Sequence, residues 1–243
     1  MGQPTLKLDD SESWHLIKVL RARQGDPVAL FDGCGNEWRC TLLSLDSTGA
    51  VLDVHKHFTV KRQGPWACSL AQALPKGKTM DQLVRRATEI GITRILPLET
   101  QRTEVHLTDK RGLNKVAKWR AAAIEACKQS GNSFVPKIDP VRRLEDWLKE
   151  PLDSTGDTLY LAACLEPPTV NLRSTLKHFV DQNRRLPRAV TWLIGPEGDF
   201  TSEEYQLIRE REFAPISLAQ HVLRVETAAI YALSILDYEA HHH

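Results

Sequence analysis

The sequence predicts an α/β protein of two domains, a small β-rich domain over residues 1–73 and a larger domain over residues 74–240. In the first part, short apolar runs are separated by breaks that contain glycine, which is the spacing of a small barrel. In the second part, apolar runs of strand length alternate with stretches whose apolar residues recur at helical spacing. Such alternation is typical of a parallel sheet with helices on both faces.

The small domain is expected to contain one short helix followed by strands. Residues 15–20 have the pattern of a helical turn, which Gly25 and Pro27 bring to an end. Strand-like runs follow at 28–31, 38–43 and 51–54, with glycine-containing breaks at 32–33 and 48–49.

The rest of the chain is expected to alternate strands and helices, starting with a strand that adjoins the domain boundary. The predicted strands are 67–73, 92–98, 159–164, 189–194 and 215–218, and the predicted helices are 79–90, 114–130, one after residue 201, and 227–238. Thr79 with Gln82, and Thr201 with Glu204, have the spacing of a capping box at a helix start.

The composition excludes several classes of protein. Of the 243 residues, 42% are hydrophobic and 26% charged, which excludes a disordered, collagen-like or disulfide-stapled chain. No apolar run approaches the roughly 20 residues that cross a bilayer, and the N-terminus has no apolar signal core, so a cytoplasmic protein with no membrane partner is expected. Residues 241–243, three histidines, have the pattern of a purification-tag remnant.

The net charge of +1 hides an uneven distribution. Residues 1–73 carry 8 basic and 8 acidic groups, residues 76–120 carry 11 and 5, and residues 121–243 carry 13 and 18. The middle segment therefore has a net charge of +6, although the total argues against a nucleic-acid partner. Two interpretations remain open for this segment, a solvated face and a surface that binds nucleic acid.

Metal and common nucleotide sites are not favoured. The five cysteines include no C-x-x-C pair and no partner pair for zinc, so they are expected to be reduced and mostly buried thiols. Gly77-Lys78-Thr79 ends like a phosphate loop, but its first glycine position holds Gln72. The dinucleotide fingerprint and the zinc-protease motif are incomplete or missing as well, so no metal is expected.

Two loops are the best candidates to carry chemistry. They follow predicted strands at residues 193–201 and 218–227, and ligands of parallel α/β sheets bind at the carboxyl ends of strands. Gly195 and Gly198 permit close approach of the backbone to a ligand. A tight turn explains glycines equally well, but it does not explain Glu197 between Pro196 and Gly198.

These two loops resemble a known family. Residues 193–200 (LIGPEGDF) and 218–228 (LAQHVLRVETA) are similar to the two knot loops of the RsmE family, ribosomal RNA uracil-N3 methyltransferases of the trefoil-knotted SPOUT superfamily. Further segments that resemble the family are 19–21, 30–33, 75–91, 97–102 and 124–131, so the likeness covers nearly the whole chain in order.

The resemblance implies the architecture, the cofactor and the partners. It implies a PUA-like RNA-binding β-barrel, then a SPOUT α/β methyltransferase domain whose deep trefoil knot binds S-adenosylmethionine. It also implies a homodimer that methylates N3 of a uridine in 16S rRNA, within the small ribosomal subunit. The residues that would line the cofactor are Leu161, Leu193, Gly195, Glu197, Gly198, Leu218, Leu223 and Thr227.

Three side chains are candidates for catalysis. Uracil N3 carries a proton at neutral pH, so methylation needs a base or a cation that stabilises the uracil anion. Arg224 suits the second role because its guanidinium stays protonated and offers a planar fork of donors, although a plain ion pair with Glu226 would also explain it. Glu226 or Glu197 is the candidate base, whereas a carboxylate before Thr227 also simply suits a helix N-terminus.

Contacts to RNA are expected from lysines and arginines, which bind phosphates with little sequence information. The candidates are Lys18, Arg21 and Arg23 in the first domain, and Lys76, Lys78 and Arg102 in the second. Each of them could also be an ordinary solvated residue.

The sequence departs from the family pattern at two loop positions and at its start. Asp199 and Ala219 stand where the family has glycine, and Ala219 is a problem only if its φ must be positive. The Arg-rich opening of the family is missing before the barrel, so some RNA contacts are expected to be missing. Two alternatives therefore stay open, a related knotted enzyme that methylates a ribose 2′-hydroxyl of tRNA, and a non-catalytic RNA-binding factor of ribosome assembly.

Overall fold

A computed structural model describes residues 4–46, 49–62, 64–105, 107, 109–152 and 155–240. The chain divides into two compact units, Met1–Arg62 and Gln63–His243. The purification-tag assignment of residues 241–243 lies outside the described residues.

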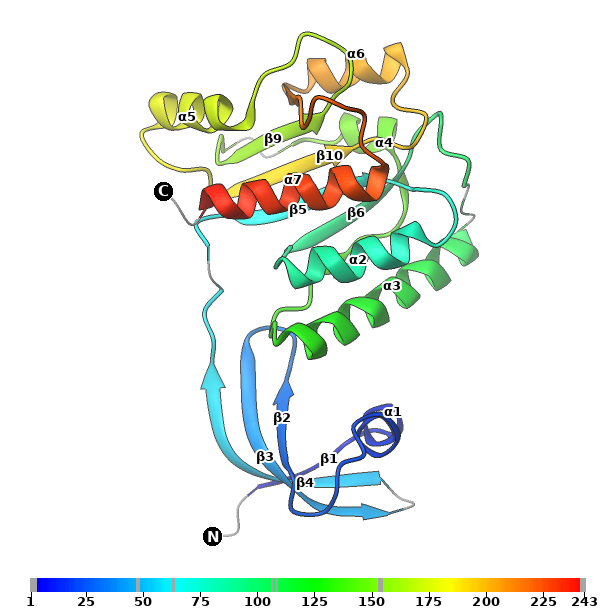
Figure 1. The fold of residues 1–243 in the computed structure, drawn as a ribbon, viewed down its shortest axis with the longest axis vertical. Coiled ribbons are helices and arrows are strands. Elements are labelled where there is room, and N and C mark those ends of the chain that lie inside the picture. Colours follow the sequence, from blue (N-terminus) through cyan, green and yellow to red (C-terminus); the bar gives the residue numbers. More distant parts are fainter. Residues whose placement is uncertain are drawn as a thin grey trace. The chain divides into compact units, whose positions relative to one another are not determined.

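The small unit is a four-stranded antiparallel sheet with one helical segment (Figure 1). The strands are β1 (Thr5–Lys7), β2 (Pro27–Phe31), β3 (Asn36–Asp46) and β4 (Gly49–Thr59), in the order β1-β4-β3-β2. The register shifts twice between β3 and β4, which bends these long strands. A small core forms from Leu16, Cys40, Leu42, Ala50 and Leu52.

The helical segment of this unit begins earlier than predicted. It comprises α1 (Asp10–Trp14) and the π-helical turn η1 (His15–Val19), whereas the sequence predicted a helix over 15–20. Asp9 caps α1, because its carboxylate accepts a hydrogen bond from the backbone N–H of Glu12 at 2.8 Å.

The large unit is built on a seven-stranded parallel sheet. Its strands are β5 (Ala67–Ala73), β6 (Arg94–Glu99), β7 (Lys137–Ile138), β8 (Arg142–Arg143), β9 (Thr158–Ala163), β10 (Ala189–Ile194) and β11 (Ala214–Ile216). The order is β11-β9-β10-β5-β6-β7, with β8 also paired to β6. The carboxyl ends of β9, β10 and β11 therefore lie next to one another, which is where the sequence predicted a ligand.

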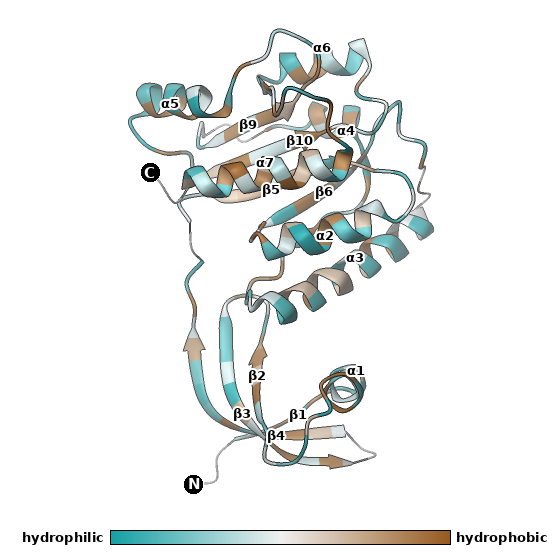
Figure 2. Ribbon diagram, in the orientation of Figure 1, coloured by the Kyte–Doolittle hydropathy of each residue, from teal (hydrophilic) through white to brown (hydrophobic). Residues whose placement is uncertain are grey.

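Helices cover both faces of this sheet, as predicted. One core packs the sheet against α2 (Thr79–Glu89), α3 (Asp109–Ser130), α5 (Leu172–Asn183) and α7 (Val225–Ala240). The other packs it against α4 (Leu144–Lys149) and α6 (Ser202–Glu210). Figure 2 shows α2, α5 and α6 in mixed teal and brown, the pattern of helices with one buried side.

The two capping boxes have different outcomes. The box at α6 is confirmed, since the Thr201 hydroxyl and the Glu204 carboxylate each accept a hydrogen bond from the other's backbone N–H. The predicted capping box at α2 is wrong. Lys78 is the residue that precedes this helix and no side chain caps it, because Thr79 is already the first helical residue.

Strand β5 belongs to the sheet of the large unit. The sequence placed a domain boundary after residue 73, whereas the compact units divide after Arg62 and β5 pairs with both β6 and β10. A short apolar strand has the same pattern in either kind of sheet, so only its pairing assigns it. Helices α4 and α5 and the two-residue strands β7 and β8 were not predicted.

Three further observations concern sites that the sequence disfavoured. Within the described ranges, no helix is long and apolar enough to cross a membrane. The same residues contain no cluster of histidine, cysteine, aspartate or glutamate that could bind a metal ion. The five cysteines are free thiols, of which Cys40, Cys127 and Cys164 are buried.

Candidate functional site

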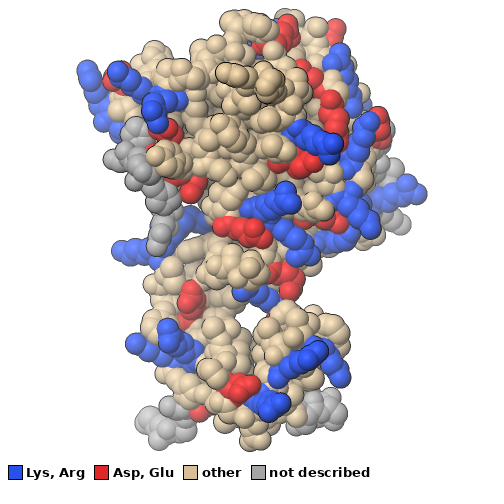
Figure 3. Space-filling view, viewed as in Figure 1, with Lys and Arg blue, Asp and Glu red and all other residues tan. Residues whose placement is uncertain are grey.

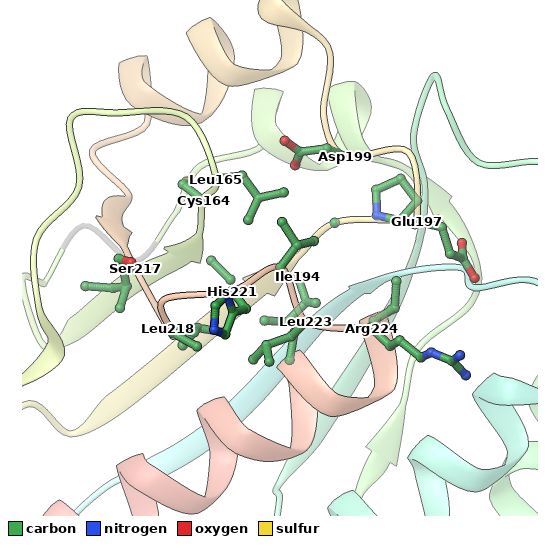
Figure 4. A pocket seen from close by; sticks show the side chains of 18 of the residues that line it. Cys164, Leu165, Ile194, Glu197, Asp199, Ser217, Leu218, His221, Leu223 and Arg224 are labelled. Atoms are coloured by element: carbon green, nitrogen blue, oxygen red, sulfur yellow. The ribbon is translucent and has the colours of Figure 1, made fainter.

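A pocket of about 750 Å³ opens at the carboxyl ends of β9, β10 and β11 (Figure 4). Its walls are the segments that follow these strands, with Thr79 from α2 and the start of α7. Figure 4 shows Leu165 and Asp199 on one side and His221 and Leu223 on the other, with Ile194 between them. The volume lies within the range of pockets for small molecules and cofactors.

The loop after β10, residues 195–200, is shaped by close packing. A Cβ on Gly195 would lie 3.1 Å from the Phe200 ring, and a Cβ on Gly198 would lie 3.3 Å from Cβ of Arg102. Neither glycine is among the residues with a positive φ. These glycines are therefore required by the protein's own side chains, whereas the sequence suggested an approach to a ligand.

Glu197 ties this loop to the neighbouring strand end. Its Oε1 accepts a hydrogen bond from the backbone N–H of Lys76 at 2.9 Å, just beyond β5. Arg102 makes a second link, because its guanidinium donates to the carbonyl oxygen of Gly198 at 2.7 Å. Both links join segments more than ninety residues apart, so they hold the loop in place across the sheet.

Asp199 makes a third link and adopts an unusual backbone conformation. Its φ is +61°, a left-handed value that aspartate tolerates better than most residues. The hydroxyl of Tyr205 donates to its carboxylate, with both oxygens at 2.8 Å. Tyr205 Oη also accepts from the backbone N–H of Leu165 at 3.3 Å, so one buried hydroxyl connects the segments after β9 and β10.

The negative charge of Asp199 acts on neighbours in the pocket wall. The pKa of Tyr205 is raised, first by burial and then by its hydrogen bond to Asp199. Burial, and next the charge of Asp199, raise the pKa of the Cys164 thiol to about 12. Cys164 is therefore a neutral thiol at physiological pH and no nucleophile.

The loop after β11, residues 217–224, is constructed differently. Among the described residues, the backbone N–H groups of 218–223 donate no hydrogen bond within the chain. Ala219 has no positive φ, so alanine replaces the family glycine here without strain. Val222 is 76% exposed, and Gln220 and His221 are exposed too. This loop therefore presents free donors and side chains to the pocket and the solvent.

Arg224 and Glu226 lie where this loop enters α7. Both line the pocket, and Figure 4 shows Arg224 and Glu197 at the same end of it. Within the part of the chain that the structure describes, no carboxylate pairs with the Arg224 guanidinium, so the plain ion pair considered from the sequence is not formed. Glu226 lies in the first turn of α7, where the helix dipole favours a negative charge.

Some of the residues predicted to bind the cofactor line the pocket, and others do not. Gly195, Glu197, Leu218 and Leu223 line the pocket. Leu161 and Leu193 are fully buried in the cores on opposite faces of the sheet. Gly198 packs on Arg102 behind the loop, and Thr227 is exposed on α7.

The sequence analysis missed several residues that line this pocket. Cys164 and Leu165 follow β9, and Thr169, Ser217 and His221 lie in the loops around it. Only their position after a predicted strand could have indicated them, since their residue types carry no motif. The sequence indicates Asp199 only as a departure from a family pattern, whereas the structure places it in the pocket wall.

The predicted RNA-binding side chains are all exposed. In the small unit Lys18 lies in the last turn of η1, and Arg21 and Arg23 follow this element. In the large unit Lys76 pairs with Glu104 at 2.6 Å, and Arg102 is engaged with Gly198. Figure 3 shows further lysine and arginine side chains over α2 and α3, with acidic side chains among them, and Lys118 pairs with Asp81 at 2.6 Å.

Family models match both units. A model described as an RNA methyltransferase domain matches residues 62–237, and a model described as an RNA methyltransferase PUA domain matches residues 8–54. Together they confirm the two predicted kinds of domain.

Curated relatives agree along nearly the whole chain. The chain is 31% identical to ribosomal RNA small subunit methyltransferase E of Synechocystis over 97% of its length and 73% of that protein. It is 27% identical to the protein of the same name from Bacillus subtilis, over 97% of this chain and 91% of that protein.

Solved structures of similar fold contain a bound cofactor. A methyltransferase of Legionella pneumophila in complex with S-adenosylmethionine is 29% identical, with a TM-score of 0.86, over 98% of this chain and 93% of that one. A ribosomal RNA small subunit methyltransferase E of Neisseria gonorrhoeae bound to the same cofactor is 27% identical, with a TM-score of 0.84 and the same coverage. The α/β fold with its PUA domain is thereby confirmed, and the trefoil knot stays a prediction.

Proposed function

Because this chain belongs to the RNA methyltransferase family that includes ribosomal RNA small subunit methyltransferase E, we propose that it methylates N3 of a uridine in 16S rRNA with S-adenosylmethionine. The observation that carries the proposal is the pocket, which lies at three adjacent strand ends and is lined by both loops that resemble the family. Arg224, an arginine without a carboxylate partner among the described residues, lines the same pocket.

The residues of the pocket suit this cofactor. Apolar side chains of Ile194, Leu218, Leu223 and Val225 offer a surface for a flat base, and the unused N–H groups of 218–223 offer hydrogen bonds to its polar edge. The volume of about 750 Å³ accommodates a nucleoside with an amino-acid side arm. We assign the cofactor to Gly195, Leu218 and Leu223, with Leu165 and Ser217 added from the structure.

The chemistry requires alignment and charge stabilisation from the protein. S-adenosylmethionine supplies a methyl group that is already activated by its sulfonium. Arg224 stabilises the uracil anion, because its guanidinium can donate to an oxygen that flanks N3. A base first takes the N3 proton. The N3 electron pair of the resulting anion would then bond to the methyl carbon, while the sulfur–carbon bonding pair stays on sulfur.

Glu226 is the better placed of the two candidate bases. Oε1 of Glu197 already accepts the Lys76 N–H, which makes this carboxylate an anchor for the loop. Glu226 lines the pocket two residues after Arg224. It lies in the first turn of α7, at the part of the pocket wall that also carries Arg224.

Exposed cations of both units would bind the RNA backbone. Lys18, Arg21 and Arg23 have no ion-pair partner in the described parts of the chain, so their charges are free to meet phosphate. Exchange of Arg21 and Arg23 for glutamate should weaken RNA binding and flatten its salt dependence while S-adenosylmethionine binding is unchanged. Unchanged RNA binding would show that these arginines of the small unit do not contact the RNA.

We infer further that the protein acts as a homodimer on the small ribosomal subunit, in the cytoplasm. Tyr231 and Tyr238 of α7 are 44% and 58% exposed, and an interface between copies would cover them. Sedimentation equilibrium tests the dimer, and a single species of 27.5 kDa contradicts it.

The decisive experiment uses 16S rRNA that lacks N3-methyluridine. This RNA and unmodified tRNA are incubated separately with the protein and S-adenosylmethionine, and digested nucleosides are identified by mass spectrometry. N3-methyluridine from the rRNA supports the proposal. A 2′-O-methylated nucleoside from tRNA supports the related knotted enzyme, and no product with bound cofactor supports the non-catalytic assembly factor.

A further inference from the structure

We propose that the Asp199 carboxylate, held by Tyr205 in the pocket wall, is a fixed negative charge that favours the cationic methyl donor over its neutral product. The inference rests on the proposed function. It assigns Asp199 a positioning role in the discrimination between S-adenosylmethionine and S-adenosylhomocysteine, and it assigns no step of the chemistry to this residue.

The backbone at Asp199 indicates that its side chain is needed. With φ at +61°, glycine would be the residue of least strain, and an aspartate is retained there at some cost in stability. A residue in this region at a pocket wall is often part of a functional arrangement. The contact of the carboxylate with Tyr205 is one benefit that offsets this strain.

The carboxylate is held rigidly. Both of its oxygens lie 2.8 Å from Oη of Tyr205, whose side chain is only 4% exposed. The Tyr205 ring packs edge-on against Phe200 with the ring centroids 5.5 Å apart, and Phe200 in turn packs on Gly195. A charge fixed in this way exerts its field without first losing side-chain freedom.

The other charged groups of the pocket do not supply this charge. Glu197 is engaged with the Lys76 N–H, and Glu226 lies at the positive N-terminus of α7. Arg224 is positive and repels a cation, and His221 adds no negative charge. Asp199 is therefore the described lining carboxylate that neither accepts a backbone N–H nor lies at a helix N-terminus, and Arg209, 5.9 Å from the Tyr205 ring, is the cation that partly offsets its charge.

The reaction changes the charge that Asp199 would sense. The donor carries one more positive charge than the product, because the sulfonium becomes a thioether when the methyl group leaves. The amino and carboxyl groups of the side arm are the same in both molecules. A fixed negative charge therefore stabilises the donor complex more than the product complex, which aids release of the product.

The test compares the affinities of the two molecules for the full chain without RNA. Isothermal titration calorimetry gives the ratio of the dissociation constant of S-adenosylhomocysteine to that of S-adenosylmethionine. Asp199→Asn keeps an acceptor for Tyr205 and a residue that tolerates positive φ, but it removes the charge. We expect the ratio to fall about fivefold, mostly through weaker binding of the donor.

Two further variants make the result specific. Asp199→Gly removes the charge and also the strain, so it should lower the ratio by the same factor. Asp181→Asn removes a carboxylate from the exposed surface of α5 and should leave the ratio unchanged. High salt should shrink the difference between the wild type and Asp199→Asn, since the pocket is open to solvent.

Each outcome is decisive for one of the two claims. In one outcome, the wild type binds both molecules while the ratio of their dissociation constants is unchanged in Asp199→Asn and Asp199→Gly. That result overturns this inference and leaves the methyltransferase function in place. An equal loss of affinity for both molecules also overturns it, because a merely structural role predicts that result. A wild type that binds neither molecule contradicts the proposed function and this inference with it.

Discussion

The two loops that form the pocket are held in different ways. Residues 195–200 after β10 are fixed from outside, by the Lys76 N–H on Glu197, by Arg102 on Gly198 and by Tyr205 on Asp199. Residues 217–224 after β11 have few such links, and the N–H groups of 218–223 donate no hydrogen bond to any described residue. One wall of the pocket is preorganised, and the other presents its polar groups unpaired.

The difference indicates that the two loops have different functions. A preorganised wall sets the shape of a site at little cost on binding, because its side chains are already ordered. A wall with free donors and an unpaired arginine supplies the groups that a ligand meets. Apart from the charge of Asp199, changes in the first loop should therefore act through structure, and changes in the second through binding or catalysis.

The largest effect is expected from Arg224→Ala in the second loop. Loss of the cation that stabilises the uracil anion should lower turnover by about a hundredfold or more. Affinity for S-adenosylmethionine and the midpoint of thermal unfolding should change little, because Arg224 is exposed and unpaired among the described residues. Methyl transfer to 16S rRNA and calorimetry measure both quantities.

Arg224→Lys is the matched control, since it keeps the charge without the planar fork and should recover only part of the activity. Turnover near that of the wild type in Arg224→Ala would show that this loop binds ligand without contributing to catalysis.

The next effect is expected from Gly195→Ala in the first loop. The new methyl group would meet the Phe200 ring at 3.1 Å, so the unfolding free energy should fall by about 1–3 kcal/mol. Chemical denaturation measures this loss. Ala219→Gly in the second loop is the control, with an expected change below about 1 kcal/mol, and equal losses in both variants contradict the comparison.

A smaller effect is expected from Glu197→Gln. The side chain still accepts the Lys76 N–H but loses the charge that strengthens this bond, so the stability should fall by about 1 kcal/mol. The dependence of turnover on pH should keep its shape, because an anchor does not transfer protons. Loss of the acidic limb of that profile would instead identify Glu197 as the base.

The smallest effect is expected from Val222→Ser. This side chain is 76% exposed, so its removal should change the unfolding free energy by less than about 0.5 kcal/mol. Thermal unfolding checks this. A large loss would show that the second loop is packed as tightly as the first.

Much of the fold could be predicted because its signals are local. The strands β5 and β10 have the predicted bounds, and the capping box of Thr201 and Glu204 is present. The missed box at Thr79 and the unpredicted α4 and α5 show the limit of local patterns. Whether Thr79 precedes the helix or begins it depends on the turn before it, which Gly77 forms with a positive φ.

By itself, the sequence determined the two kinds of domain, the loops at the strand ends and the candidate catalytic residues in them. The strand ends follow from periodicity, whereas the kinds of domain and the candidate residues follow from the family that the contiguous motifs resemble. Only the tertiary structure decided which residues meet. Lys76 contacts Glu197 and Leu165 contacts Tyr205 because β5, β9 and β10 are neighbours in the sheet. The order of the strands depends on how the helices bury the two faces of the complete sheet. No single segment of the sequence contains this information.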